Sequence, residues 1–226
     1  MSGMTDLHLA PALAGALEAL GYTAQDQAVR EQVPTAARGH NLALAWPPAA
    51  RYAAPALAGM MSAQLGSSAS SLVLAPAHTL AEWADIILPL ARAAGLPALV
   101  AETPARAARS LADGQLRLLV TSPATALALL ERSALKADQL GHIVLAWPDL
   151  FESDEALAPL MQDVPAEAQR IVMLATPAVN HPLLERYARR ALVTGPLVPA
   201  AEAEIPARPP VRVVSTGWNQ RAAALQ

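Results

Sequence analysis

The stretch Ile143-Val144-Leu145-Ala146-Trp147-Pro148 decides the fold, because it joins an uninterrupted apolar run to a proline. Continuous apolar runs of this length are typical of strands that are buried on both faces of a parallel sheet. Proline has no N–H to donate to a neighbouring strand, so it marks the point where the strand ends. We therefore predict a central parallel strand that ends before Pro148.

The same design recurs along the chain. Four further apolar runs each lead into a proline, and they occupy residues 42–47, 72–76, 118–123 and 171–177. A sixth run, at 98–101, lies between the second and third of the five proline-ended runs. Helical spacing fills the intervals, as in residues 79–94, where Leu80, Trp83, Ile87 and Leu90 share one stripe. Further helices are expected at 11–20, 25–38, 124–132, 153–162 and 183–190.

Strict alternation of strands and helices predicts an α/β three-layer sandwich with a mainly parallel sheet. We expect this domain to span residues 1–196. A Pro- and Ala-rich linker is expected at 197–210. Residues 211–214 then indicate a strand and 219–226 the start of a helix, so 211–226 is interpreted as the beginning of a truncated second domain.

Composition narrows the classes of function. The chain has 226 residues, of which 54% are hydrophobic and 15% charged, so a large core is expected. With no cysteine and no histidines at metal-ligand spacing, we expect no disulfide and no metal site. No apolar run is long enough for a bilayer and no signal peptide is evident, which favours a cytoplasmic protein without membrane contact. A net charge of −3 disfavours strong RNA binding by this domain alone.

Motifs at the strand ends carry a more specific resemblance. Gly21-Tyr22, Gly39-His40-Asn41-Leu42 and residues 75–81 (Ala-Pro-Ala-His-Thr-Leu-Ala) follow one another in an order and spacing that resemble the N-terminal lobe of DEAD-box RNA helicases. The match covers about residues 7–196. The resemblance implies a RecA-like sandwich of the P-loop NTPase type, ATP with Mg²⁺ as cofactor, and RNA and a second RecA-like lobe as partners.

The nucleotide-handling residues depart from that pattern. Val29 stands where the family has its adenine-recognising glutamine. In residues 46–53, Tyr52 replaces the phosphate-loop lysine and Ala53 the Mg²⁺-binding hydroxyl, while two prolines remove N–H donors. Arg51 could still contact an anion. In the Asp-Glu-Ala-Asp signature, Ala146 and Trp147 replace the metal-holding and water-positioning acids. The resemblance therefore implies that ATP and Mg²⁺ binding and ATP hydrolysis are lost.

Two groups of residues mark the places where function is expected. The vestigial nucleotide pocket comprises Tyr22, Val29, Trp46, Ala49, Arg51, Tyr52, Ala53, Ala146, Trp147, Asp149 and Thr176. The possible nucleic-acid face comprises His78, Thr79, Ser122 and Thr125, where His78 and Thr125 replace family arginines. No residue is assigned as catalytic or as a metal ligand.

The two Ala-Trp-Pro triplets allow two interpretations. In one, the indoles of Trp46 and Trp147, together with Tyr52, fill the vestigial pocket and stabilise it without a ligand. In the other they are ordinary packing residues at strand ends. The arginines at 186, 189 and 190 form a modest basic face, which is most often merely solvated.

Three functions remain open. The leading one is a helicase-derived pseudoenzyme that acts as an interaction module for RNA or a protein partner. The second is a weak nucleotide-binding lobe that is part of a larger ATP-dependent RNA helicase. The third, an active helicase, requires the missing residues to come from elsewhere.

Overall fold

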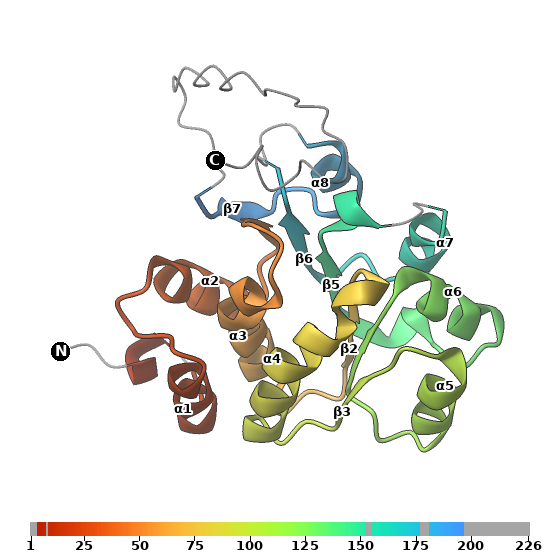
Figure 1. Cartoon of the computed structure of the whole chain (residues 1–226), viewed down its shortest axis with the longest axis horizontal. Helices are drawn as coiled ribbons and strands as arrows, with labels where there is room; N and C mark the ends of the chain where they lie inside the picture. Colours follow the sequence, from red (N-terminus) through yellow and green to blue (C-terminus); the bar gives the residue numbers. More distant parts are fainter. Residues whose placement is uncertain (1–3, 8, 152–154, 177–180, 197–226) are drawn as a thin grey trace, which may run out of the picture.

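The apolar runs form strands of one sheet in the computed structural model, which describes residues 4–7, 9–151, 155–176 and 181–196 (Figure 1). The strands are β1 (Leu42–Ala45), β2 (Ser70–Leu74), β3 (Ala98–Val100), β4 (Leu118–Thr121), β5 (Leu140–Ala146), β6 (Gln169–Leu174) and β7 (Leu192–Thr194). All their described pairings are parallel, in the order β3-β4-β2-β5-β6-β1-β7. The predicted linker at 197–210 and the predicted second-lobe segment at 211–226 lie outside the described residues.

In the described part of the chain, two α-helices precede β1, and one α-helix connects each pair of consecutive strands. They are α1 (Pro11–Ala19), α2 (Gln27–Ala37), α3 (Ala54–Gln64), α4 (Leu80–Ala93), α5 (Pro104–Ala112), α6 (Pro123–Glu131), α7 (Leu157–Gln162) and α8 (Pro182–Tyr187). Short 3-10 turns are η1 (Met4–Leu7), η2 (Ala50–Ala53), η3 (Ala77–Thr79), η4 (Ala137–Gln139) and η5 (Pro148–Leu150).

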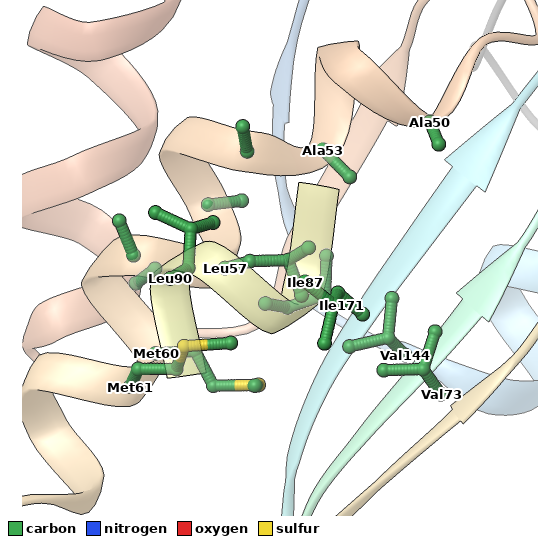
Figure 2. Close-up of a cluster of buried hydrophobic side chains, with 14 of the residues drawn as sticks. Ala50, Ala53, Leu57, Met60, Met61, Val73, Ile87, Leu90, Val144 and Ile171 are labelled. Carbon is green, nitrogen blue, oxygen red and sulfur yellow. The ribbon is translucent and has the colours of Figure 1, made fainter. Parts of the chain in front are cut away.

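Alternation along the strands divides the core into two layers. Leu42, Val73, Val144 and Ile171 pack against α1–α4, whereas their strand neighbours, such as Leu145, pack against α5–α8. Figure 2 shows Val73, Val144 and Ile171 side by side on three adjacent strands, facing the helix side chains. This arrangement confirms the predicted three-layer sandwich with a parallel sheet.

Some helices differ in extent from the prediction, and three elements of the structure were not predicted. Helix α7 begins at Leu157, later than the expected 153, and α8 ends at Tyr187 rather than at 190. The backbone of Arg190 is in the left-handed region, with φ of 61°, which no helix can accommodate. Helices α3 and α5 and strand β7 were not predicted. Helix α3 is buried almost all round, so its sequence has no amphipathic stripe to detect.

Close packing of α2 on α3 depends on one glycine. A Cβ at Gly59 would lie 2.5 Å from the carbonyl oxygen of Val33 and 2.9 Å from the Cβ of Ala36. Only glycine therefore permits the two helix backbones to approach this closely. The contact fixes α3, whose first turn follows the loop described next.

Candidate functional site

The carboxyl ends of β1, β5 and β6 lie side by side, since β6 is paired with both other strands. In open parallel sheets, ligands bind beyond these ends. The segment from Trp46 to Ala53, which leads from β1 through η2 into α3, stands where the sequence predicts the phosphate loop. The chain then enters η5 from β5 through Trp147, and Ala175 follows β6.

Trp147 is buried between this loop and helix α4. Its backbone is left-handed, with φ of 50° and ψ of 61°, and its side chain is 1% exposed. The indole Nε1 donates a hydrogen bond to the carbonyl oxygen of Trp46 at 3.2 Å. The ring also contacts Trp83 of α4, with centroids 6.0 Å apart. Trp147 thus ties the end of β5 to the end of β1 across the intervening β6.

The first turn of α4 supplies a charge to the same loop. Glu82 lies next to Trp83, and its Oε1 accepts a hydrogen bond from the backbone N–H of Ala50 at 2.7 Å. Ala50 begins η2, directly ahead of α3, where free N–H groups and the helix dipole favour an anion. A carboxylate of the protein therefore takes a bond of the kind that a phosphate loop offers to its ligand.

The outer wall of the loop is aromatic. The rings of Trp46 and Tyr52 stack with centroids 5.0 Å apart, and Arg51 lies over the Tyr52 ring at 4.9 Å. The Arg51 guanidinium also donates to the Tyr52 hydroxyl at 3.1 Å. The hydroxyl of Tyr22 donates to the carbonyl oxygen of Arg51, and burial raises the pKa of Tyr22 to about 12, against a lowering by Arg51. Tyr22 therefore stays a neutral donor.

A cavity of about 360 Å³ lies beside this wall. Its lining includes Tyr22, Asp26, Trp46, Arg51 and Tyr52, so the structure brings together four of the residues assigned to the vestigial pocket. The remaining assigned residues do not line it.

The other assigned residues of the pocket have separate positions. Val29, Ala53 and Ala146 are core residues with 1% exposure or less. Ala49 is extended backbone ahead of η2, and Thr176 is exposed. Asp149 is exposed, and its Oδ2 accepts from the N–H of Ala175 at 3.3 Å, which joins η5 to the end of β6.

The residues assigned to the nucleic-acid face are engaged locally. Ser122 caps α6 by accepting from the N–H of Thr125 at 3.2 Å, and the Thr125 hydroxyl donates to the carbonyl oxygen of Glu102 at 3.3 Å. The Thr79 hydroxyl donates to the carbonyl oxygen of Pro76 at 2.8 Å, while His78 is exposed. These bonds hold turns in place and leave His78 as the freely accessible side chain of the four.

An apolar cavity of about 150 Å³ lies between the two segments of this face. Its lining includes Ala77, Ser122, Ala124 and Phe151. His78, Thr79 and Thr125 do not line it. The cavity beside this face is therefore lined mainly by carbon atoms, and Ser122 is the one assigned residue among its lining.

Two contacts at the site were not predicted from the sequence. Glu82 lies on the helix that the apolar stripe predicts, but its spacing does not indicate a contact with Ala50, 32 residues earlier. Trp83 was predicted as a core residue of that stripe, without its contact with Trp147. Both depend on how α4 sits against the sheet, which the sequence pattern does not specify.

Neither a cluster of metal-binding side chains nor a membrane-spanning helix occurs in the part of the chain that the structure describes. Within the described ranges, no group of three or more His, Cys, Asp or Glu side chains is placed to hold a metal ion. None of the helices in that part of the chain combines the length and hydropathy needed to cross a bilayer.

Solved structures provide the comparison. Similar folds include a hypothetical ATP-dependent RNA helicase from Sulfolobus tokodaii, which is 13% identical with a TM-score of 0.64 over 80% of this chain and 56% of that one. Prp28 from Chaetomium thermophilum, bound to ADP, is 17% identical with a TM-score of 0.68 over 85% of this chain and 50% of that one. Dbp5 from S. cerevisiae, bound to Gle1 and IP6, is 13% identical with a TM-score of 0.66 over 86% and 52%.

No protein-family profile matches the sequence, and no curated protein matches it. The chain spans about half the length of the helicase structures that it resembles. At these identities the likeness establishes the fold alone. The chain has the fold of a helicase RecA-like lobe, as the sequence predicted.

Proposed function

We propose that this chain is a helicase-type RecA-like domain that does not hydrolyse ATP and that serves as an interaction module for RNA or a protein partner. The hydrogen bond from the Ala50 N–H to the Glu82 carboxylate carries the proposal. It supplies the negative charge at the start of η2 that a bound phosphate would otherwise supply. A triphosphate entering the loop would have to displace this carboxylate and would be repelled by it.

The side chains nearby do not compensate for that repulsion. Phosphoryl transfer requires cations around the phosphates, a metal ion and a group that positions the attacking water. At the corresponding positions stand Tyr52, Ala53, Ala146 and Trp147, none of which carries a charge or a carboxylate. Arg51 is the nearby cation, and it is engaged with the Tyr52 ring and hydroxyl.

The partner is proposed to bind at the apolar cavity that Ala77, Ala124 and Phe151 line. A face with these side chains favours a protein over a nucleic-acid backbone, whose affinity comes mainly from cations. A second RecA-like lobe in a longer protein is part of the same proposal. An RNA oligonucleotide titrated at several salt concentrations tests the choice, because RNA binding would weaken steeply with salt, whereas contact with a protein would not.

A weak nucleotide-binding lobe of a larger helicase is the second candidate. The cavity beside Tyr22, Trp46 and Tyr52 favours it, because aromatic rings can stack on a base without any contact to phosphates. This candidate predicts that adenosine, ADP and ATP bind with similar affinity and that Mg²⁺ has no effect.

Equilibrium dialysis with labelled ATP and labelled adenosine, each with and without Mg²⁺, separates the candidates. The first candidate predicts no saturable binding of either ligand up to about 1 mM, an affinity of roughly −4 kcal/mol. Saturable binding of both ligands, with reduced affinity in Tyr52→Ala, would favour the second. Binding of ATP alone at micromolar concentration, with release of phosphate, would overturn both.

A further inference from the structure

A further cavity, of about 430 Å³, lies at the amino edge of the sheet, opposite the loop at 46–53. Asn41, directly before β1, and Arg170, near the start of β6, are part of its wall. Arg186 of α8 and Arg189 beyond it complete a set of three arginines around one space. In a chain with a net charge of −3, such a concentration of positive charge is a local feature.

Arg170 is held in a fixed orientation. Its guanidinium donates hydrogen bonds to the carbonyl oxygens of Pro165, Ala166 and Ala168, at 2.9, 2.9 and 3.2 Å. Its backbone N–H donates to the Oδ1 of Asn41 at 2.8 Å. An arginine side chain has five N–H donors, so these carbonyl bonds leave part of the guanidinium available to a ligand. Partial burial lowers the pKa of Arg170, because a charged group is less well solvated there.

The other two arginines are oriented by contacts that use one donor at most. Arg186 lies over the ring of Tyr187, 5.1 Å from its centroid, and the Nε of Arg189 donates to the carbonyl oxygen of Glu185 at 3.0 Å. Among the described residues, the terminal N–H groups of both side chains have no hydrogen-bond acceptor. Within the described ranges, no ion pair joins any of the three arginines to a carboxylate. Glu167 acts on Arg170 only through its field, which is weaker than the effect of burial.

From this arrangement we propose that the cavity between β1, β6, α7 and α8 binds a small phosphomonoester. Three guanidiniums on one space match the charge and the oxygen geometry of a phosphate dianion. The volume lies within the range of small-molecule sites, which is roughly 300–1,000 Å³. The side-chain amides of Asn41 and Gln162 offer additional hydrogen bonds for ligand hydroxyls, as a sugar phosphate would require. The cavity lies away from the carboxyl edge of the sheet, and the proposal does not rest on the proposed function.

Calorimetric titration of the whole chain with ribose 5-phosphate, with ribose as the uncharged probe, tests the proposal. We expect saturable binding of one ribose 5-phosphate, competition by inorganic phosphate, and no binding of ribose. The double variant Arg186→Gln/Arg189→Gln should weaken binding at least about tenfold. Arg170 is left unchanged in this variant because it holds the turn at 165–168 together.

A matched control separates a local site from general charge. Arg106 and Arg109 are exposed on α5 with the same spacing as Arg186 and Arg189, so Arg106→Gln/Arg109→Gln removes equal charge elsewhere. The control variant should bind ribose 5-phosphate as the parent chain does. Absence of ribose 5-phosphate binding, or equal weakening in both double variants, would overturn the proposal. Binding of an RNA oligonucleotide through Arg186 and Arg189 without binding of ribose 5-phosphate would also overturn it.

Discussion

The two edges of the sheet differ in the kind of side chain that they bury. At the carboxyl edge, where open parallel sheets bind ligands, β5 ends in Ala146, and Trp46 and Trp147 follow β1 and β5. Toward the amino edge, buried polar side chains bond to one another, and Gln64 donates to the carbonyl oxygens of Ala69 and Arg117 and accepts from the hydroxyl of Ser71.

Ser71 and His142 in this amino-edge network illustrate how polar groups can be structural. The Ser71 hydroxyl donates to Gln64, so the Nδ1 of His142, 3.1 Å away, must donate to the Ser71 oxygen. A histidine that donates in this direction cannot remove the serine proton, so the pair is no catalytic dyad. Both edges therefore stabilise the fold, but by different means. Aromatic rings such as that of Trp147 pack at the carboxyl edge, whereas buried polar side chains bond to one another at the amino edge.

The largest expected effect is at the carboxyl edge. Trp147→Ala removes a buried indole and its hydrogen bond to Trp46, so we expect the free energy of unfolding to fall by ~3–5 kcal/mol in urea denaturation. Trp147→Phe is the control, because it retains much of the packing and should lose less. Equal, small losses in both variants would contradict a packing role for the indole.

The next effect is at the amino edge. Gln64→Leu removes three hydrogen bonds from this network and leaves the Ser71 hydroxyl without its acceptor, so unfolding should become easier by about 2 kcal/mol. The carbonyl oxygens of Ala69 and Arg117 keep other donors. Gln27→Leu, which alters an exposed glutamine on α2, should change the unfolding free energy by less than about 0.5 kcal/mol. If both variants unfold at the same urea concentration as the parent, the amino-edge network does not stabilise the fold.

A smaller effect is expected where the carboxylate replaces a ligand. Glu82→Ala removes the bond to the Ala50 N–H and should lower the unfolding free energy by ~1 kcal/mol, the usual contribution of such a helix-end bond. Asp85→Ala, on the exposed surface of the same helix, serves as the reference. Added inorganic phosphate should raise the stability of Glu82→Ala more than that of the parent, because it can take the vacated position.

The smallest effect is a dependence on pH. Burial, and to a lesser extent Arg117, lowers the pKa of His142 below its ordinary value of 6.5. The unfolded chain therefore binds a proton at a higher pH than the folded chain does, so stability should decrease as pH falls below about 6.5. Urea denaturation at pH 7.5 and 5.5 measures this decrease. His142→Asn should reduce it, whereas His78→Asn, at an exposed site, should not.

The sequence predicted the strands better than the contacts that complete the site. Proline after an apolar run located the ends of β1, β4 and β5 within one or two residues, because strand burial and chain reversal are both local properties. Helix α3 was missed because burial on all sides removes periodicity. The bond between Glu82 and Ala50, and the cavity that Asn41 shares with Arg170, join residues far apart in the sequence. No spacing rule detects such pairs.

The backbone amide of Ala50 provides the most direct test of the account. In a ¹⁵N–¹H correlation spectrum, ATP with Mg²⁺ should leave the Ala50 resonance unshifted, since Glu82 already accepts its proton. The Glu82→Ala spectrum identifies the resonance of the amide without its carboxylate partner. A saturable shift of Ala50 in the parent chain, at micromolar ATP and dependent on Mg²⁺, would mean that the loop does bind phosphates.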